Sequence, residues 1–108
     1  MRLPNADQVV IRDDKIRAYL LDPSGRSPSK ARLFAALGYT QDNWEVFGRD
    51  LRAQHLSQDA IELAPGDFGW IWKIEAQLTG PKGSANIRSI WIIPFDTGIP
   101  ELVSAYRV

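Results

Sequence analysis

The chain of 108 residues contains no cysteine, a single histidine and no long apolar run. Without cysteine, disulfide frameworks, thiolate nucleophiles and thiolate metal sites are all excluded. With only one histidine as well, no zinc-ligand set is available, so we expect no metal site. No dinucleotide fingerprint, phosphate loop or nucleophile elbow is present, and we therefore expect no cofactor.

No stretch is apolar for long enough to span a membrane, so we expect no membrane partner. The segment Met1–Asp7 lacks the apolar core of a secretory signal. These two absences predict a cytoplasmic protein. The length leaves room for a single domain over residues 1–108.

The chain also has a net charge of zero, because 13 Lys and Arg residues balance 13 Asp and Glu residues. This balance argues against broad nucleic-acid binding, which depends on an excess of cations over phosphate. The charges are nevertheless unevenly spread: residues 1–58 carry nine cations against seven anions, and residues 59–108 carry four against six. A local basic cluster would therefore matter more than the total.

The first half of the chain has the residue spacing of helices. We expect a first helix from Asp13 or Asp14 to the residue before Pro23, and a second over about residues 28–37. Thr40 is expected to cap a third helix. The buried stripe of this third helix is predicted to contain Trp44, Phe47, Leu51 and His55.

The second half changes to the two-residue period of strands. Strands are expected over residues 61–63, 68–78, 85–93 and 102–106, with Gly- and Pro-rich turns between them. Within the last of them, Leu102, Ser104 and Tyr106 are expected to share a face, as are Trp70, Trp72, Ile74, Ala76 and Leu78 in the second. The predicted fold class is α+β, with about three N-terminal helices packed on one face of a four-stranded antiparallel sheet.

The clearest candidate site is the start of the second helix, which carries three cations within residues 26–32. A helix start already holds unpaired N–H groups and partial positive charge, so cations there favour an anion as their partner. Ser27 fits the N-cap position and Pro28 the first helical position. We therefore take Arg26, Ser27, Ser29 and Lys30 as candidate phosphate-binding residues. The competing interpretation is a solvated basic turn, with the Lys30 stem covering apolar surface at the rim of the core.

Landmarks along the whole chain also carry a resemblance to a known family. They are Leu3-Pro4-Asn5-Ala6, Tyr19-Leu20-Leu21, Lys30-Ala31-Arg32-Leu33-Phe34, Leu37-Gly38-Tyr39, Asn43-Trp44, Trp91 and Ile99-Pro100-Glu101-Leu102-Val103-Ser104-Ala105-Tyr106. The chain resembles an uncharacterised bacterial domain family of about this length, found alone and at the C-terminal ends of polymorphic toxins. At the level of fold it is similar to the ribonuclease-toxin superfamily that includes barnase, EndoU, the tRNA-cleaving colicins and RelE.

The resemblance implies a toxin-like, metal-independent ribonuclease, with RNA as substrate and a cognate immunity-type protein as partner. It implies a basic position on the second helix, matched by Lys30, and polar positions on the last strand, matched by Ser104 and Tyr106. His55 is added to these candidate catalytic residues as the only histidine. The family pattern favours histidine at position 29, where this chain has Ser29.

Two functions of different classes remain open. A ribonuclease without a metal needs a proton acceptor near neutral pH, and the missing histidine and the neutral charge favour a non-catalytic interaction module or degraded toxin held by a partner protein. The basic helix start and the family context favour the ribonuclease. His55 has a competing interpretation as a packing residue with a satisfied ring nitrogen.

Overall fold

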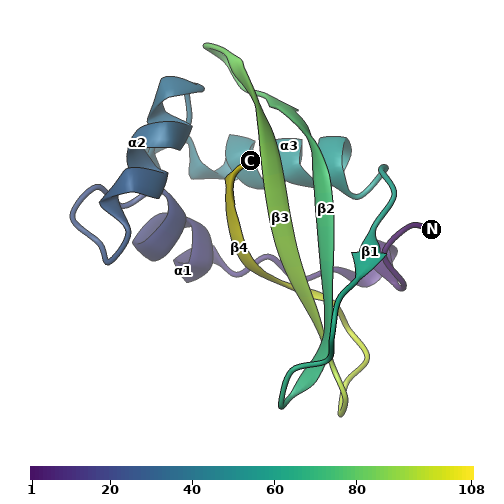
Figure 1. Ribbon diagram of the computed structural model, residues 1–108. Coiled ribbons are helices and arrows are strands. Elements are labelled where there is room, and N and C mark those ends of the chain that lie inside the picture. Colours follow the sequence, from purple (N-terminus) through teal and green to yellow (C-terminus); the bar gives the residue numbers. More distant parts are fainter.

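Helices occupy the first half of the chain in the computed structural model, which describes residues 1–108 (Figure 1). A short turn, η1 (Ala6–Gln8), comes before α1 (Asp13–Lys15), which runs directly into the wider π-helical turn η2 (Ile16–Leu20). The helix α2 (Pro28–Ala36) follows, and the turn η3 (Gln41–Asn43) leads into α3 (Trp44–His55). No helix is long and apolar enough to cross a membrane.

Strands occupy the second half, as the change of periodicity predicts. They are β1 (Ile61–Glu62), β2 (Gly69–Thr79), β3 (Ser84–Pro94) and β4 (Glu101–Arg107), arranged in the order β1-β2-β3-β4 with every neighbouring pair antiparallel. The segment before α1 adds only one isolated parallel bridge to these pairings, between Val10 and Glu101.

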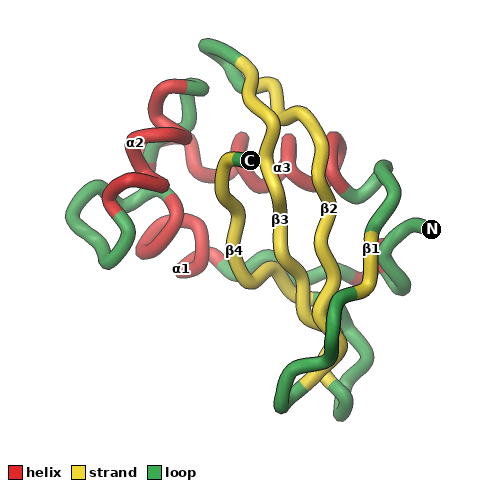
Figure 2. The backbone as a smooth tube through the Cα atoms, in the orientation of Figure 1, coloured by secondary structure: helices red, strands yellow, loops and turns green.

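The helices lie on one side of the sheet (Figures 1 and 2). Figure 2 shows α3 behind β2 and β3, whereas α1 and α2 lie beside the β4 edge, and no helix covers the face toward the viewer. The predicted α+β class is therefore confirmed, with three helices packed on one face of a four-stranded antiparallel sheet.

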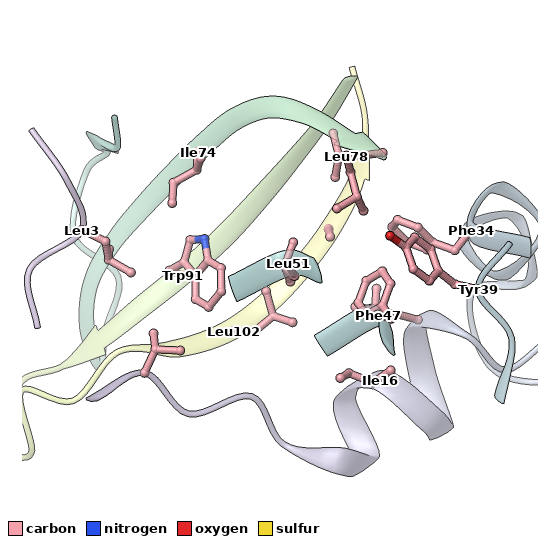
Figure 3. Close-up of a cluster of buried hydrophobic side chains, with 14 of the residues drawn as sticks. Leu3, Ile16, Phe34, Tyr39, Phe47, Leu51, Ile74, Leu78, Trp91 and Leu102 are labelled. Carbon is pink, nitrogen blue, oxygen red and sulfur yellow. The ribbon is translucent and has the colours of Figure 1, made fainter. Parts of the chain in front are cut away.

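The core lies between α3 and the sheet (Figure 3). Phe47, Leu51 and His55 of the predicted stripe are completely buried, as is Trp91 of β3, whereas Trp44 at the start of α3 is only half-buried. Close packing is possible because Gly48 lies against η2, where an added Cβ would be 3.3 Å from the Ile16 side chain. Helix ends follow the predicted chemistry as well, since Thr40 forms a capping box with Asn43 before α3.

The last strand departs from the predicted alternation at Val103. The pairing of β4 with β3 skips this residue, which forms a β-bulge. Leu102 therefore faces the core, while Ser104 and Tyr106 face the other way, and the prediction that all three share a face was wrong. An extra residue shifts the pleat by one position, which a count of alternating residues does not reveal.

Trp70 is a second departure. It lies on the same side of β2 as the buried Trp72 and Ile74, yet 45% of its surface is exposed. Its partner is Phe95, whose ring centroid lies 5.3 Å away in an edge-to-face arrangement. Trp70 thus shares the face of Trp72 and Ile74 as predicted, but it lies at the end of the β2–β3 pair, beyond the core, and is part of the surface there.

Candidate functional site

Tyr19 lies at the centre of a polar cluster at the β4 edge. It belongs to η2, where the chain widens from α-helical to π-helical hydrogen bonding, with Leu21 N donating to Ile16 O at 2.8 Å. Ile16 and Leu20 in the same turn are buried, whereas Tyr19 is half-buried and its hydroxyl lies 3.2 Å from the Ser104 Oγ of β4. Single π-helical turns occur often at functional sites.

Three cations surround the Tyr19 ring. The distances to the ring centroid are 4.5 Å from Arg26 Cζ, 5.4 Å from Lys15 Nζ and 5.6 Å from Lys30 Nζ. None of the three forms a salt bridge. Asp14 is the carboxylate that lines the same shallow hollow with Lys15 and Arg26, and it is exposed and unpaired as well. The hollow thus carries an excess of positive charge.

These neighbours change the acidity of Tyr19. The hydrogen bond with Ser104 lowers the pKa of the Tyr19 phenol most, burial opposes this by raising it, and Lys30 and Arg26 lower it further, so that the net pKa lies below the usual value. A phenol of lowered pKa beside unpaired cations can exchange protons with a substrate more readily than an ordinary tyrosine.

Lys30 connects the start of α2 to this cluster. Its Nζ donates a hydrogen bond to Ser27 Oγ at 3.3 Å and lies 6.0 Å from the Tyr106 ring centroid. Ser27 occupies the N-cap position as predicted, but its side chain accepts from Lys30 instead of from the helix backbone. The N–H of the exposed Ser29, in the first turn of α2, has neither a backbone acceptor nor a side-chain cap. One orphan N–H and two cations, Arg26 and Lys30, therefore meet at the predicted anion site.

A second polar chain continues from Tyr106 across the uncovered face of the sheet. Arg88 donates to the Tyr106 hydroxyl at 3.5 Å and forms a salt bridge with Glu75 at 2.7 Å, and Lys73 bonds the same carboxylate at 3.0 Å. The pKa of the Glu75 carboxyl is lowered, mainly by Lys73 and next by Arg88. The charge on Arg88 is largely matched by Glu75, so this chain adds less net charge than the cluster around Tyr19.

His55 lies elsewhere. It is completely buried between α3 and the sheet, and its Nδ1 lies within hydrogen-bond distance of Ser89 Oγ, at 2.7 Å. The same Ser89 Oγ accepts a hydrogen bond from Trp91 Nε1 at 2.9 Å. Burial lowers the pKa of His55 to about 4. The structure thus brings Lys30, Ser104 and Tyr106 together and keeps His55 apart as a packing residue.

Sequence analysis missed Tyr19, Arg88 and Glu75. By its spacing, Tyr19 shares a helix face with the apolar residues Ile16 and Leu20, and nothing in that spacing distinguishes a core tyrosine from one that turns to the β4 edge. The pairing of Glu75 with Arg88 could have been found, because a hairpin closed by Gly80–Gly83 sets these two residues opposite each other.

The cluster of Tyr19, Arg26, Lys30 and Ser104 can bind an anion and move a proton beside it. It holds cations, hydroxyl groups and one orphan N–H, and among the described residues no group of His, Asp and Glu could hold a metal ion. A phosphodiester is the substrate class that this donor set suits.

Comparison with known proteins identifies the family of the chain. The family model described as "Domain of unknown function (DUF6883)" matches residues 2–108. No curated protein and no solved structure gives a significant match. With nearly every residue matched by that one model, the chain belongs to the DUF6883 family.

Proposed function

We propose that this domain is a toxin-like, metal-independent ribonuclease that binds the RNA backbone at the cluster of Tyr19, Arg26, Lys30 and Ser104. The observation that carries the proposal is the geometry around Tyr19: its hydroxyl lies 3.2 Å from Ser104 Oγ and its ring is surrounded by three cations that form no salt bridge, an arrangement that also lowers the pKa of the phenol. RNA contains the two groups that this arrangement suits, which are a phosphate for the cations and a neighbouring 2′-hydroxyl for the proton acceptor.

The reaction that follows from this geometry is cleavage by the 2′-oxygen. Tyr19, as phenolate, accepts the 2′-hydroxyl proton, and the 2′-oxygen attacks the adjacent phosphorus while the 5′-oxygen leaves and takes a proton from solvent. Lys30 and Arg26 stabilise the charge that develops on the phosphoryl oxygens, and Ser104 holds the phenolate by its hydrogen bond. Tyr19 thus supplies the proton acceptor that the family pattern assigns to a histidine at position 29.

Two further expectations belong to this proposal. As a toxin-type domain, the chain would meet RNA in the cytoplasm, either of its own cell or of a cell to which it is delivered. A cognate immunity-type protein would inhibit it by placing acidic side chains against the cations around Tyr19, which form no salt bridge within the chain.

The test removes two cations from the site. In Arg26→Ala/Lys30→Ala we expect RNA cleavage to be lost, and the salt dependence of binding to a non-cleavable 2′-O-methyl RNA to weaken by about 0.7 in log–log slope per cation. The melting temperature should change little, since Arg26 is exposed and neither residue has an ion-pair partner. The matched control is Arg2→Ala/Lys82→Ala, which removes the same charge from positions outside the cluster.

Three results would contradict the proposal. Unfolding of Arg26→Ala/Lys30→Ala would make the two cations structural, and unchanged RNA affinity would make the cluster ordinary surface. Tight RNA binding without any cleavage by the wild type would instead favour the non-catalytic alternative, a module that holds RNA or a partner without reacting.

A further inference from the structure

Three exposed aromatic residues lie near one another where the β2–β3 pair ends at Gly69 and Pro94. This end of the two strands is at the bottom of Figure 1. Phe68 is 80% exposed, Phe95 54% and Trp70 45%, and we call this group the aromatic tip. Large apolar side chains scattered singly are ordinary on a protein surface, but aromatic residues grouped together mark a contact surface.

The aromatic tip rests on an ordered framework. Phe95 N donates to Phe68 O at 3.0 Å, which joins the two loops that carry these residues. Trp70 and Phe95 contact each other edge to face at 5.3 Å. Gly69 allows the backbones to approach, because an added Cβ there would be 2.5 Å from Ile93 O. The backbone that carries the three residues and the Trp70 and Phe95 rings are thus held in place before any partner arrives, which lowers the entropy cost of binding.

The charge around the aromatic tip has one sign. Asp67 precedes Phe68, Asp96 follows Phe95, and Glu62 lies in the neighbouring strand β1. All three carboxylates are exposed and form no hydrogen bond or ion pair. Over residues 60–72 and 94–100 there is no Lys or Arg at all. A surface that complements the aromatic tip must therefore be apolar at its centre and basic around it.

This charge excludes the other occupants in turn. RNA phosphates and the anionic lipid surface of a cytoplasmic membrane leaflet would be repelled. A second copy docking by the same tip would set acidic residues against acidic residues. We propose that the aromatic tip binds a different protein, through a surface of that partner that combines apolar side chains with Lys and Arg.

The aromatic tip is separate from the cluster around Tyr19. Ser104 pairs with Ile90 of β3, whereas Gly69 at the tip pairs with Pro94. Four residues of strand put about 13 Å between the two places. A partner at the tip can bind without covering Tyr19, so this proposal does not depend on ribonuclease activity.

The probe is a phage-displayed library of random peptides selected on the immobilised full chain. We expect enriched peptides that combine aliphatic or aromatic residues with Lys and Arg. Phe68→Ser/Phe95→Ser should weaken the binding of an enriched peptide by about tenfold or more, which corresponds to ~1.4 kcal/mol. Asp67→Lys/Asp96→Lys should weaken it too, while Val108→Ser, a change of an exposed apolar residue elsewhere, should leave it unchanged.

Several results would overturn the proposal. Enrichment of acidic or purely polar peptides, or affinity that survives both tip variants, overturns the proposal. Circular dichroism of each variant separates lost binding from lost folding, and the charge-reversal variant keeps both aromatic residues if Phe68→Ser/Phe95→Ser proves unstable. Self-association in sedimentation experiments, or binding to phosphatidylcholine vesicles, that disappears in the tip variants would assign the surface to a second copy or to lipid and would also overturn it.

Discussion

Two serine residues on neighbouring strands form hydrogen bonds with aromatic rings in opposite surroundings. Ser89 of β3 is completely buried and bonds His55 and Trp91, whereas Ser104 of β4 lies at the sheet edge and bonds Tyr19 beside Lys30. Each cluster holds one titratable ring. Burial makes His55 neutral over the ordinary pH range, and its environment offers neither solvent nor charge.

The cluster around Tyr19 has the reverse character. Its ring is half-buried and its hydroxyl bonds Ser104; this hydrogen bond, together with the cations Lys30 and Arg26, lowers the pKa of the phenol by more than burial raises it. A hydrogen bond from a titratable ring to a serine therefore does not by itself make a reactive site. Whether the ring can react depends on its exposure to solvent and on unpaired charges beside it. Substitutions in the cluster around Tyr19 should therefore change activity, whereas substitutions around His55 should change stability.

Tyr19→Phe is expected to have the largest effect, and on activity alone. Removal of the proton acceptor should lower RNA cleavage by about 100- to 10,000-fold, the range usual for a lost general acid or base. Binding of 2′-O-methyl RNA should change little, because Lys15, Arg26 and Lys30 remain. Cleavage at the wild-type rate by a correctly folded Tyr19→Phe variant would remove Tyr19 from the mechanism.

Trp91→Ala tests the other cluster and should act on stability. Trp91 is completely buried against α3, so its truncation should cost about 3–5 kcal/mol of unfolding free energy. Urea unfolding followed by circular dichroism measures this. A loss below about 1 kcal/mol would mean that the ring contributes little to the core and would contradict the structural role of this cluster.

Acid should destabilise the protein through His55. The pKa of His55 is lowered from 6.5 when unfolded to about 4 when folded, so the unfolded chain binds the proton more readily between these values. The contribution of neutral, buried His55 to the free energy of unfolding is fully present above pH 6.5 and is lost as the pH falls toward 4; the total loss is about 3 kcal/mol. His55→Asn should be less stable at neutral pH but should lack this slope; a wild-type slope in the variant would assign the effect to carboxylates.

Substitution of each serine by alanine should have the smallest effects on stability and activity. Ser89→Ala leaves the buried His55 Nδ1 and Trp91 Nε1 without their partner and should cost about 1–3 kcal/mol of stability. Ser104→Ala should cost less than about 1 kcal/mol, because Tyr19 can bond water. It should instead raise the pKa of Tyr19 and move the rise of cleavage with pH to higher pH. Equal stability losses in the two variants, with no shift in the pH profile, would erase the distinction.

Much of the fold could be predicted from the sequence, because helix caps and apolar periodicity are local signals. Thr40 was correctly predicted to cap the start of the third helical segment, where it forms a capping box. The second helix was expected over about residues 28–37; α2 covers Pro28–Ala36, and Gly38 just beyond it has a φ of 98° that suits glycine. The strand expected over residues 85–93 is β3, which lies between β2 and β4.

The parts that could not be predicted depend on departures from regular geometry. The π-helical turn that carries Tyr19 and the bulge at Val103 each shift the facing of side chains by part of a repeat, without a sequence signal of their own. The site is assembled where these two irregularities meet, since Ser104 follows the bulge directly. The same residues that broke the periodicity are therefore the ones that position the candidate site.

The central claim is that RNA binds at the cluster around Tyr19 and not at the buried histidine or the aromatic tip. Titration of ¹⁵N-labelled protein with a non-cleavable 2′-O-methyl RNA, followed by NMR residue by residue, tests it most directly. The account predicts the largest amide shifts at Tyr19, Ser29, Lys30 and Ser104, with Ser89 and Phe68 unmoved. Shifts centred on Phe68, or no shifts at RNA concentrations that saturate the binding assay, would contradict it.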